Sequence, residues 1–263
     1  MMLSSGSKSF KVAFSSLGII LVILVALPMV RMIMSADPEI MRTTITDQEV
    51  MASVFLTLGA AFWATIFCSI LGIPLAYILA RSNFPGKSLV EGLVDLPIMI
   101  PHTAAGIALL MVYGRNFFVG KAFGKIGISF VGTGVGISLA MAYVSLPFLV
   151  NAAKDGFLAV DSKLEHVART LGASPWQVFF RVTLPLAWRP ILSGGIMMWA
   201  RGISEFGSVV ILAYHPMVAP VLIWERFQAY GLKYARPVAV LLIILCLLIF
   251  ASLRWVSEAK KEA

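Results

Sequence analysis

Two charged side chains within an apolar stretch of this sequence are the first candidates for chemistry. Arg201 and Glu205 are four residues apart in the run 191–214, so on a helix they share a face and can form an ion pair. Ser204 and Ser208 lie on the same run and add hydroxyl groups. A charge inside an apolar environment is costly and is therefore a functional candidate. Two interpretations stay open: a structural ion pair that fixes this helix to its neighbours, or a polar face that lines a path or its gate.

No comparable cluster suggests catalysis. The three histidines, His102, His166 and His215, are widely separated, and no nucleophile–base pair or metal-ligand spacing accompanies them. The sequence also lacks a Gly-x-x-x-x-Gly-Lys-Ser/Thr phosphate-binding loop. We therefore expect no enzymatic activity, no catalytic residues, and no metal or cofactor bound by this chain.

A second polar group lies in the segment 154–190, between apolar runs. Ser162 and Glu165 have the spacing of a capping box, which predicts a helix start. Apolar residues then follow at i, i+3, i+4 and i+7 and form one stripe: Leu164, Val167, Ala168 and Leu171. We expect this stripe to pack back onto the protein. The opposite, polar face would then be free to contact a partner through Glu165, His166, Arg169 and Thr170.

The end of this short helix is also marked. Gly172 is placed where a left-handed residue ends a helix. After Ala173, the pattern Ser174-Pro175-Trp176-Gln177 predicts a second helix start, with Ser as cap, Pro at the first position and Gln at the third. Pro185 should stop or kink that helix. Without other information, a helix lying on the membrane surface is the alternative interpretation of this insert.

The composition indicates that these residues belong to an integral membrane protein. Hydrophobic residues make up 59% of the chain and charged residues 13%, with a mean hydropathy of +0.91, whereas soluble domains carry about 25% charged residues. Six apolar runs approach or exceed the roughly 20 residues that a helix needs to cross the hydrocarbon core. The expected fold is all-α, a single transmembrane domain over residues 1–263. The six runs are about 11–34, 50–80, 89–113, 131–153, 191–214 and 237–256.

The distribution of Lys and Arg indicates the orientation. With the N terminus inside, the inner segments carry more basic residues than the outer ones, including Lys260 and Lys261 near the C terminus. The positive-inside rule then places both termini and the insert 154–190 in the cytoplasm. The net charge of +8 is therefore explained by topology, and nucleic acid is not an expected partner.

The first run has an alternative interpretation as a cleaved signal peptide, because Lys8 and Lys11 precede it. The run is longer than a usual signal core, and no small-x-small cleavage site follows it. We expect a retained helix.

The third run contains Pro97 and Pro101, followed by His102 and Thr103. Prolines four residues apart predict a kink that frees backbone carbonyls. Such a kink serves either as a hinge that lines a path or as a packing feature.

The insert resembles the cytoplasmic "EAA" signature of importer permeases of the ATP-binding-cassette class. In that signature an acidic-Ala-Ala triplet precedes a Gly, and Ile-x-Leu-Pro follows ten positions after the Gly. Here Ala168 and Gly172 match, and Val182-x-Leu184-Pro185 follows. His166 stands at the usual Glu position, Val167 at the first Ala and Val182 at the Ile. The segments 168–174, 203–208, 96–101 and 104–110 further resemble molybdate and tungstate permeases, with sulfate permeases as near relatives.

The resemblance implies how such a chain works. Two copies form a translocation pathway, and each insert is a coupling helix seated on one of two cytoplasmic ATPase subunits, which carry the ATP and Mg²⁺. The contact residues are expected at Glu165, His166, Arg169, Thr170, Gly172, Ala173 and Ser174. An extracytoplasmic binding protein for the oxyanion completes the assembly. Sulfate or thiosulfate is the alternative substrate, and a secondary transporter, which would need internal repeats and broken helices, is the alternative class.

Overall fold

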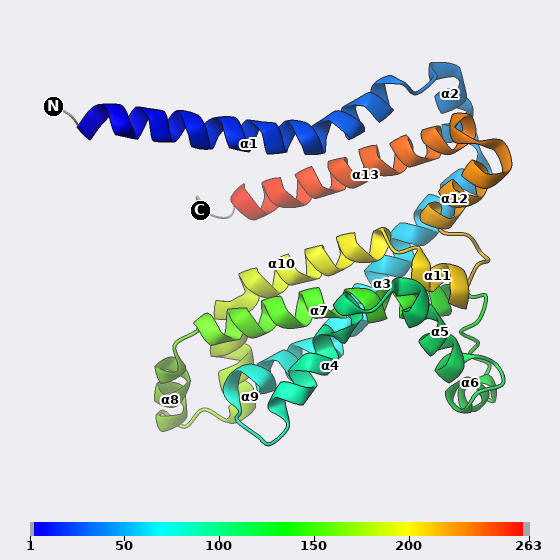
Figure 1. Cartoon of the computed structure of the whole chain (residues 1–263). Coiled ribbons are helices and arrows are strands. Elements are labelled where there is room, and N and C mark those ends of the chain that lie inside the picture. Colours follow the sequence, from blue (N-terminus) through cyan, green and yellow to red (C-terminus); the bar gives the residue numbers. More distant parts are fainter. Residues whose placement is uncertain (1–2, 260–263) are drawn as a thin grey trace. The chain divides into compact units, whose positions relative to one another are not determined.

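The computed structural model describes residues 3–259, and for residues 3–7, 9 and 252–259 it describes the backbone alone. All regular structure in this part of the chain is helical (Figure 1). The contacts within the chain divide it into two compact units, residues 1–50 with 223–263, and residues 51–222. Lys260 and Lys261, which contribute to the predicted orientation, lie outside the described residues.

The first unit contains long apolar helices at both ends of the chain. It comprises α1 (Leu3–Met34), α2 (Pro38–Thr46), α13 (Leu232–Ala259), the first residues of α3 (Gln48–Arg81) and most of α12 (Ala219–Tyr230). None of the apolar stretch Phe10–Met34 of α1 is buried within the chain. Because such a surface is unfavourable in water, α1 must be covered by lipid or by another protein chain.

An ion pair joins α12 to the junction between α2 and α3. Arg226 Nη2 lies 2.6 Å from Asp47 Oδ2 and 3.1 Å from Glu49 Oε2. The hydrogen bond from Arg226 holds the pKa of Asp47 below its ordinary value of 3.8. This junction is therefore stabilised by a carboxylate that is ionised at neutral pH.

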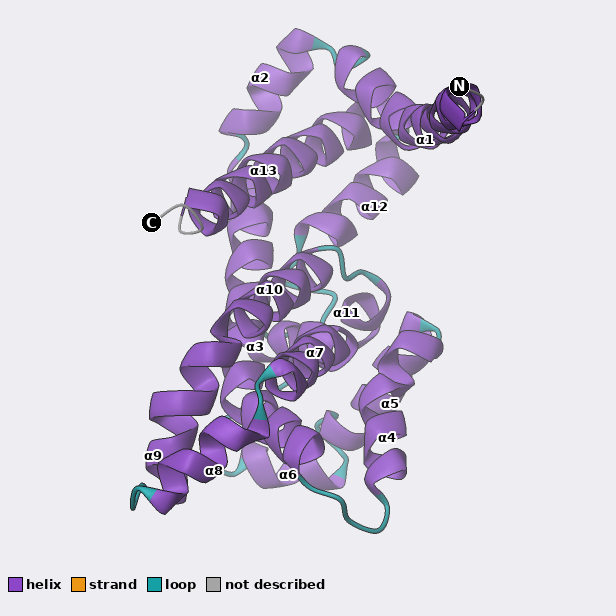
Figure 2. Cartoon of the chain, turned by 90° about the vertical axis from the view of Figure 1, so that its left-hand side faces the viewer, coloured by secondary structure: helices purple, strands orange, loops and turns teal. Residues whose placement is uncertain are grey.

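The second unit is built around α3, α7 (Gly134–Ala159) and α10 (Leu184–Ile203). Helices α7 and α10 lie side by side (Figures 1 and 2). A Cβ atom at Gly194 would come within 2.6 Å of the Ala152 Cβ, and one at Gly156 within 2.8 Å of the Pro190 Cβ. The glycines are thus required for the close approach of these helices. The adjoining core contains Ala76, Leu79, Val94, Val150, Ala153, Phe157, Val160 and Ala187.

Two of the predicted runs are interrupted. The run 89–113 consists of α4 (Lys87–Met99) and α5 (His102–Tyr113), which meet at an angle of 117°, so the kink predicted from the prolines is confirmed. The run 191–214 ends as α10 at Ile203 and resumes as the short α11 (Gly207–Leu212). The prediction of an unbroken helix over 191–214 is therefore wrong. Proline at the first break lacks the backbone donor that a helix needs.

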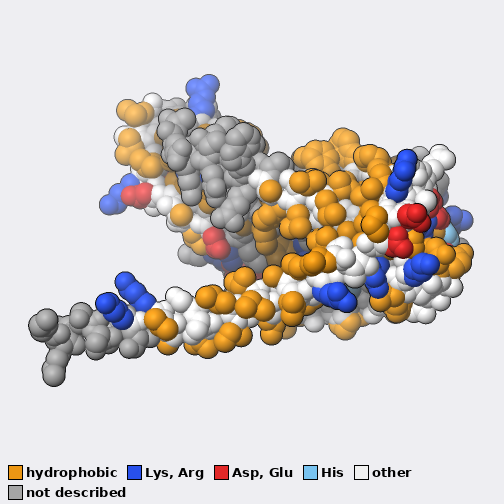
Figure 3. All heavy atoms as spheres, turned by 90° about the horizontal axis from the view of Figure 1, so that it is seen from above, with side chains coloured by type: hydrophobic (Ala, Val, Ile, Leu, Met, Phe, Trp, Pro, Cys, Tyr) orange, Lys and Arg blue, Asp and Glu red, His pale blue; other side chains and the backbone are white. Residues whose placement is uncertain are grey.

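Four helices in the described part of the chain are long and apolar enough to cross a membrane, and a fifth crossing results if the bent pair counts as one. The four are Phe10–Met34, Gln48–Arg81, Gly134–Ala159 and Leu232–Ala251. Figure 3 shows long stretches of surface on which hydrophobic side chains predominate. The remaining helices are α6 (Phe118–Gly124), α8 (Ser162–Thr170) and α9 (Pro175–Val178), followed by a π-helical turn (Phe179–Thr183). The protein is thus a multi-pass membrane protein.

Candidate functional site

The first helix of the insert, α8, begins and ends by local hydrogen bonding. The carboxylate of Asp161 accepts a hydrogen bond of 2.9 Å from the backbone N–H of Lys163. The predicted capping box of Ser162 and Glu165 is wrong, because the cap lies one residue earlier and Glu165 has another partner. Gly172 has φ +87°, which confirms the predicted left-handed end of this segment.

Glu165 turns inward and holds α8 to the membrane helices. Its side chain is only 3% exposed, and Oε1 lies 2.8 Å from Nη2 of Arg81 at the end of α3. The hydroxyl of Thr183 donates a second bond, of 2.9 Å, to the same oxygen. Arg81 also donates to the carbonyl of Val160. The prediction that Glu165 lies on the exposed face is wrong, since a nearly buried carboxylate needs these partners.

The apolar stripe of α8 faces outward instead. Leu164, Val167 and Leu171 are 48%, 58% and 83% exposed, whereas Ala168 is half-buried. The prediction that this stripe packs back onto the protein is therefore wrong. The ion pair of Glu165 with Arg81 determines which side of α8 turns inward, and the apolar stripe is left unpartnered.

The remaining polar residues of α8 are exposed and bonded within their own helix. The His166 Nδ1 lies 2.8 Å from the Ser162 carbonyl, and the Thr170 hydroxyl donates to the carbonyl of His166. Arg169 Nε donates to the carbonyl of Glu165 at 3.3 Å. Their hydrogen bonds are all to carbonyl groups of the same helix.

The second helix start is confirmed in full. The Ser174 hydroxyl accepts from the Gln177 N–H, and the Gln177 side chain accepts from the Ser174 N–H at 2.8 Å. Helix α9 then continues through the π-helical turn into α10, with the N–H of Leu184 bonded to the carbonyl of Phe179. Pro185 therefore does not end the helix. Its missing N–H falls directly after the π-helical turn, where the helical hydrogen-bond pattern is already shifted. The second half of the insert is therefore continuous with α10.

The ion cluster, which we define as His102, Arg201, Ser204, Glu205 and Ser208, lies where the two interrupted runs meet. Arg201 Nη2 is 3.0 Å from Glu205 Oε2, so the predicted pair is confirmed. The other oxygen, Oε1, accepts from the N–H and the hydroxyl of Ser208 at 2.9 Å. Ser204 accepts from Arg201 at 3.2 Å. Glu205 is fully buried.

His102 belongs to this cluster although sequence reasoning did not place it there. Its Nδ1 lies 2.8 Å from Glu205 Oε2, and Arg201 Nη2 lies within 2.9 Å of both ring nitrogens. It is the first residue of α5, directly after Pro101. The only signal in the sequence was a polar residue at a proline break inside an apolar run.

Close packing fixes the two breaks against each other. A Cβ atom at Gly207 would come within 2.8 Å of the His102 Cβ, and one at Gly106 within 2.9 Å of the Ser208 Cα. Glu205 is thus compensated by an arginine, a histidine and an amide in one compact group. The side chains of Arg201 and His102 remain 22% and 36% exposed, so the cluster reaches the surface of the chain.

No group of His, Cys, Asp and Glu residues within the described ranges is arranged to hold a metal ion. The chemistry available here is that of charge pairing and hydrogen bonding.

The fold, the helical insert and the polar cluster at broken membrane helices define a membrane transport protein. Residues 72–261 match the family described as binding-protein-dependent transport system inner membrane component. The chain belongs to this family.

Individual relatives agree with this assignment. The chain is 44% identical to the molybdate/tungstate transport system permease protein WtpB of Thermococcus kodakarensis, over 94% of this chain and 96% of that protein. It is 33% identical to a probable sulfate transport system permease protein of Chlorokybus atmophyticus, over 88% of this chain and 84% of that protein.

Solved structures share the fold. A bacterial ABC transporter involved in the import of the acidic polysaccharide alginate superposes with a TM-score of 0.75 at 17% identity, covering 98% of this chain and 99% of the other. A second structure, the alginate transporter in complex with a pentasaccharide-bound periplasmic protein, gives 0.72 at 16% identity and covers 94% of both chains.

Proposed function

We propose that this chain is the permease subunit of an ATP-driven importer for molybdate or tungstate. The observation that carries the proposal is α8, a short helix held to α3 by a buried ion pair that presents an apolar face outward. The identity of 44% with a molybdate/tungstate permease supports the substrate. Sulfate is the alternative, supported by the relative at 33% identity.

The chain crosses the membrane six times as a single domain, with α4 and α5 counted as one crossing and α10 with α11 as another. Helix α10 alone, at 20 residues, is about 30 Å long, close to the thickness of the hydrocarbon core. The excess of basic residues at the predicted inner segments supports cytoplasmic termini. The insert then lies in the cytoplasm, because α8 follows the C-terminal end of α7.

The exposed face of α8 contacts a separate ATPase subunit. Leu164, Val167 and Leu171 provide the apolar contact, and burial of each such side chain contributes about 1.5–3 kcal/mol. The polar rim consists of His166, Arg169 and Thr170, followed by the turn Gly172, Ala173 and Ser174. Glu165 has a different role, because it transmits force between the ATPase contact and α3 through Arg81.

ATP and Mg²⁺ bind to the ATPase partner, since this sequence has no phosphate-binding loop. Hydrolysis is therefore an activity of the complex.

The ion cluster is a gate on the translocation path. In this structure the Glu205 carboxylate forms an ion pair with Arg201 and neutralises its charge. Arg201 is therefore not free to bind an oxyanion. Movement at the two helix breaks separates the pair and exposes Arg201 transiently. The two helix breaks support this role, because interrupted helices in a membrane are tolerated where the backbone lines a cavity.

Two copies of the chain form the pathway, and an extracytoplasmic binding protein delivers the oxyanion. The family description refers to binding-protein-dependent transport. A structure of similar fold contains a periplasmic protein, which supports the same arrangement here.

The test is ATP hydrolysis by the complex in liposomes, with molybdate, tungstate or sulfate supplied in turn with the binding protein. Leu171→Asp places a charge on the exposed face of α8, and Ser162→Asp adds the same charge outside that face. We expect the first variant to lose the ATPase subunit or its anion-stimulated hydrolysis, and the second to behave as wild type.

The stimulating anion identifies the substrate. If both variants behave as wild type, α8 is not the ATPase contact. If no ATPase co-purifies and anion uptake follows an ion gradient, the chain is a secondary transporter.

A further inference from the structure

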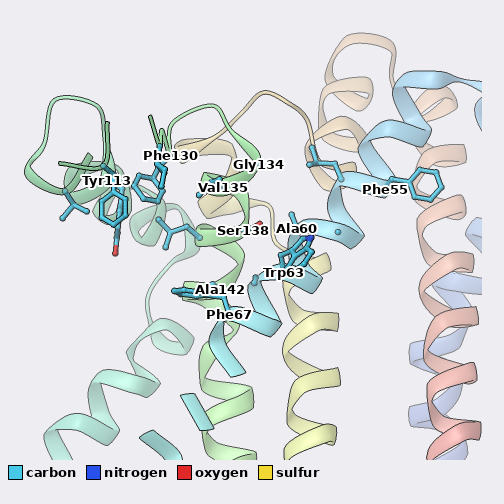
Figure 4. Close-up of a pocket in the computed structure, with 17 residues that line it drawn as sticks. Phe55, Ala60, Trp63, Phe67, Tyr113, Phe130, Gly134, Val135, Ser138 and Ala142 are labelled. Carbon is cyan, nitrogen blue, oxygen red and sulfur yellow. The ribbon is translucent and has the colours of Figure 1, made fainter. Parts of the chain in front are cut away.

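An apolar cavity lies at the end of α7 that is opposite the insert. Its volume is about 980 Å³, and it lies between α3, the start of α7 and the segment around α6. Figure 4 shows Trp63 and Phe67 on one side, Tyr113 and Phe130 on the other, and Ser138 of α7 between them. All lining residues belong to the second compact unit. The walls are almost wholly hydrocarbon and aromatic.

The dimensions of the cavity match one leaflet of a bilayer. Its walls extend from Phe55 to Phe67 on α3 and from Gly134 to Ala142 on α7. At 1.5 Å per residue these stretches are about 18 and 12 Å long, roughly half of the 30 Å hydrocarbon core. A cavity of this length accommodates a hydrocarbon chain that runs along the helices.

A second cavity of about 510 Å³ adjoins the first, since both are lined by Tyr113, Ile128 and Phe130. Its chemistry is cationic: Arg115, Lys121 and Lys125 line it. The segment 114–133 contains no Asp or Glu. None of these three basic side chains forms an ion pair with any side chain that the structure describes. The positive charge here is uncompensated.

The second cavity also contains a buried hydroxyl that lacks a partner. Ser129 Oγ has no hydrogen bond among the described residues, although the residue lines the cavity. An unsatisfied buried polar group costs about 1–3 kcal/mol. The oxygen itself is shielded from the cavity, so an oxygen-rich ligand removes that cost once the Ser129 side chain rotates towards it.

We propose that the two cavities together bind one anionic phospholipid, with its phosphate at Lys121, Lys125 and Arg115 and a hydrocarbon chain in the apolar cavity. The apolar cavity alone would accept any helix or lipid. The basic rim at its mouth selects an anionic headgroup, because Lys and Arg form charge-assisted hydrogen bonds with phosphate oxygens. The site lies in the leaflet opposite the insert, since α7, with 26 residues, is about 39 Å long.

The experiment is native mass spectrometry of the purified transporter complex, exchanged into phosphatidylglycerol or phosphatidylcholine with identical acyl chains. Wild type retains phosphatidylglycerol in preference, up to one molecule per copy of this chain. In Lys121→Gln/Lys125→Gln we expect about 30-fold weaker retention of phosphatidylglycerol, since each Lys near an anionic group contributes about fivefold. The control Arg42→Gln/Lys233→Gln removes the same charge at exposed positions elsewhere and retains the wild-type preference.

A second variant blocks the apolar cavity. At Gly59, which lines it, a Cβ atom meets nothing within 4 Å, so Gly59→Phe fills the cavity without a backbone clash. We expect this variant to lose both lipids. The control is Gly92→Phe. A Cβ atom at Gly92 also meets nothing within 4 Å, but Gly92 does not line the cavity, so this variant should retain lipid as wild type does.

Three results would overturn the site. The first is equal retention of the two lipids by wild type. The second is unchanged lipid retention in Gly59→Phe; if this variant also loses the pairing of two copies, the cavity is assigned to a second chain. The third is loss of binding-protein stimulation in Lys121→Gln/Lys125→Gln with lipid retention unchanged, which would assign the basic rim to that protein.

Discussion

Replacement of Glu165 by alanine should release α8 from the membrane helices. Glu165 is the buried carboxylate that joins α8 to Arg81 and to Thr183. Its removal leaves the Arg81 guanidinium without an anion, although the Arg81 side chain is only 16% exposed to solvent. Thr183 loses its shortest hydrogen bond. Since α8 is only nine residues long, it has little stability of its own. Loss of the Glu165 contacts therefore weakens the attachment of α8 to α3.

The magnitude follows from the burial of the pair. Removal of one partner of a buried ion pair costs about 3–5 kcal/mol. Because Arg81 keeps some access to water and its bond to the Val160 carbonyl, we place the cost near the lower limit, about 3 kcal/mol. Each 1.4 kcal/mol is a factor of ten, so the detached state of α8 should become roughly 100-fold more populated.

Hydrogen exchange of the assembled complex measures this directly. Amides of residues 162–171 should exchange roughly 100-fold faster in Glu165→Ala, as the detached population predicts. Glu165→Gln should show a smaller effect, because its amide oxygen still accepts from Thr183, and Ser162→Ala serves as the control on the same helix. In a double-mutant cycle, Arg81→Ala should add little to Glu165→Ala if the pair acts as a unit.

Unchanged exchange in residues 162–171 of Glu165→Ala would refute this reasoning. Additive effects of Arg81→Ala and Glu165→Ala would show that the two side chains stabilise the chain separately.

Three further predictions concern other contacts. Gly106→Ala should destabilise the chain by about 1–3 kcal/mol, because the new Cβ atom would lie 2.9 Å from the Ser208 Cα. Thermal unfolding measures this, and a midpoint equal to that of wild type contradicts the prediction. Asp47→Asn should be less stable than wild type at neutral pH, because the pKa of Asp47 is lowered in the folded state by the hydrogen bond from Arg226. The difference should be fully present above 3.8, the ordinary pKa of Asp, and should decrease as the pH falls through the lowered folded-state pKa. Chemical unfolding as a function of pH measures this, and a difference that does not change with pH contradicts the assignment. Ser174→Ala should cost about 1 kcal/mol by loss of the capping box, visible as faster exchange at the start of α9, whereas Ser162→Ala should not.

The amino-acid sequence alone determined the class of the protein and several local features. Composition and the lengths of the apolar runs predicted a helical membrane protein, because the bilayer sets the length of a crossing helix. The helix end at Gly172, the capping box of Ser174 and Gln177, and the kink at Pro101 were also predictable. Each of these depends on residues within one or two turns of each other, so the pattern contains the whole interaction.

The tertiary structure decided what each helix face meets. The period of α8 correctly grouped Leu164, Val167 and Leu171 on one face, yet that face turns outward. Its orientation depends on Arg81, which is 84 residues before Glu165. The ion cluster was likewise only partly predictable. Arg201 and Glu205 are neighbours in the chain and were predicted to pair, whereas His102 lies 103 residues before Glu205 and was not predicted to join them. Helical periodicity specifies which side chains share a face, but the partner of a buried charge is chosen by how distant segments pack, because only a packed interior excludes the water that would otherwise solvate that charge.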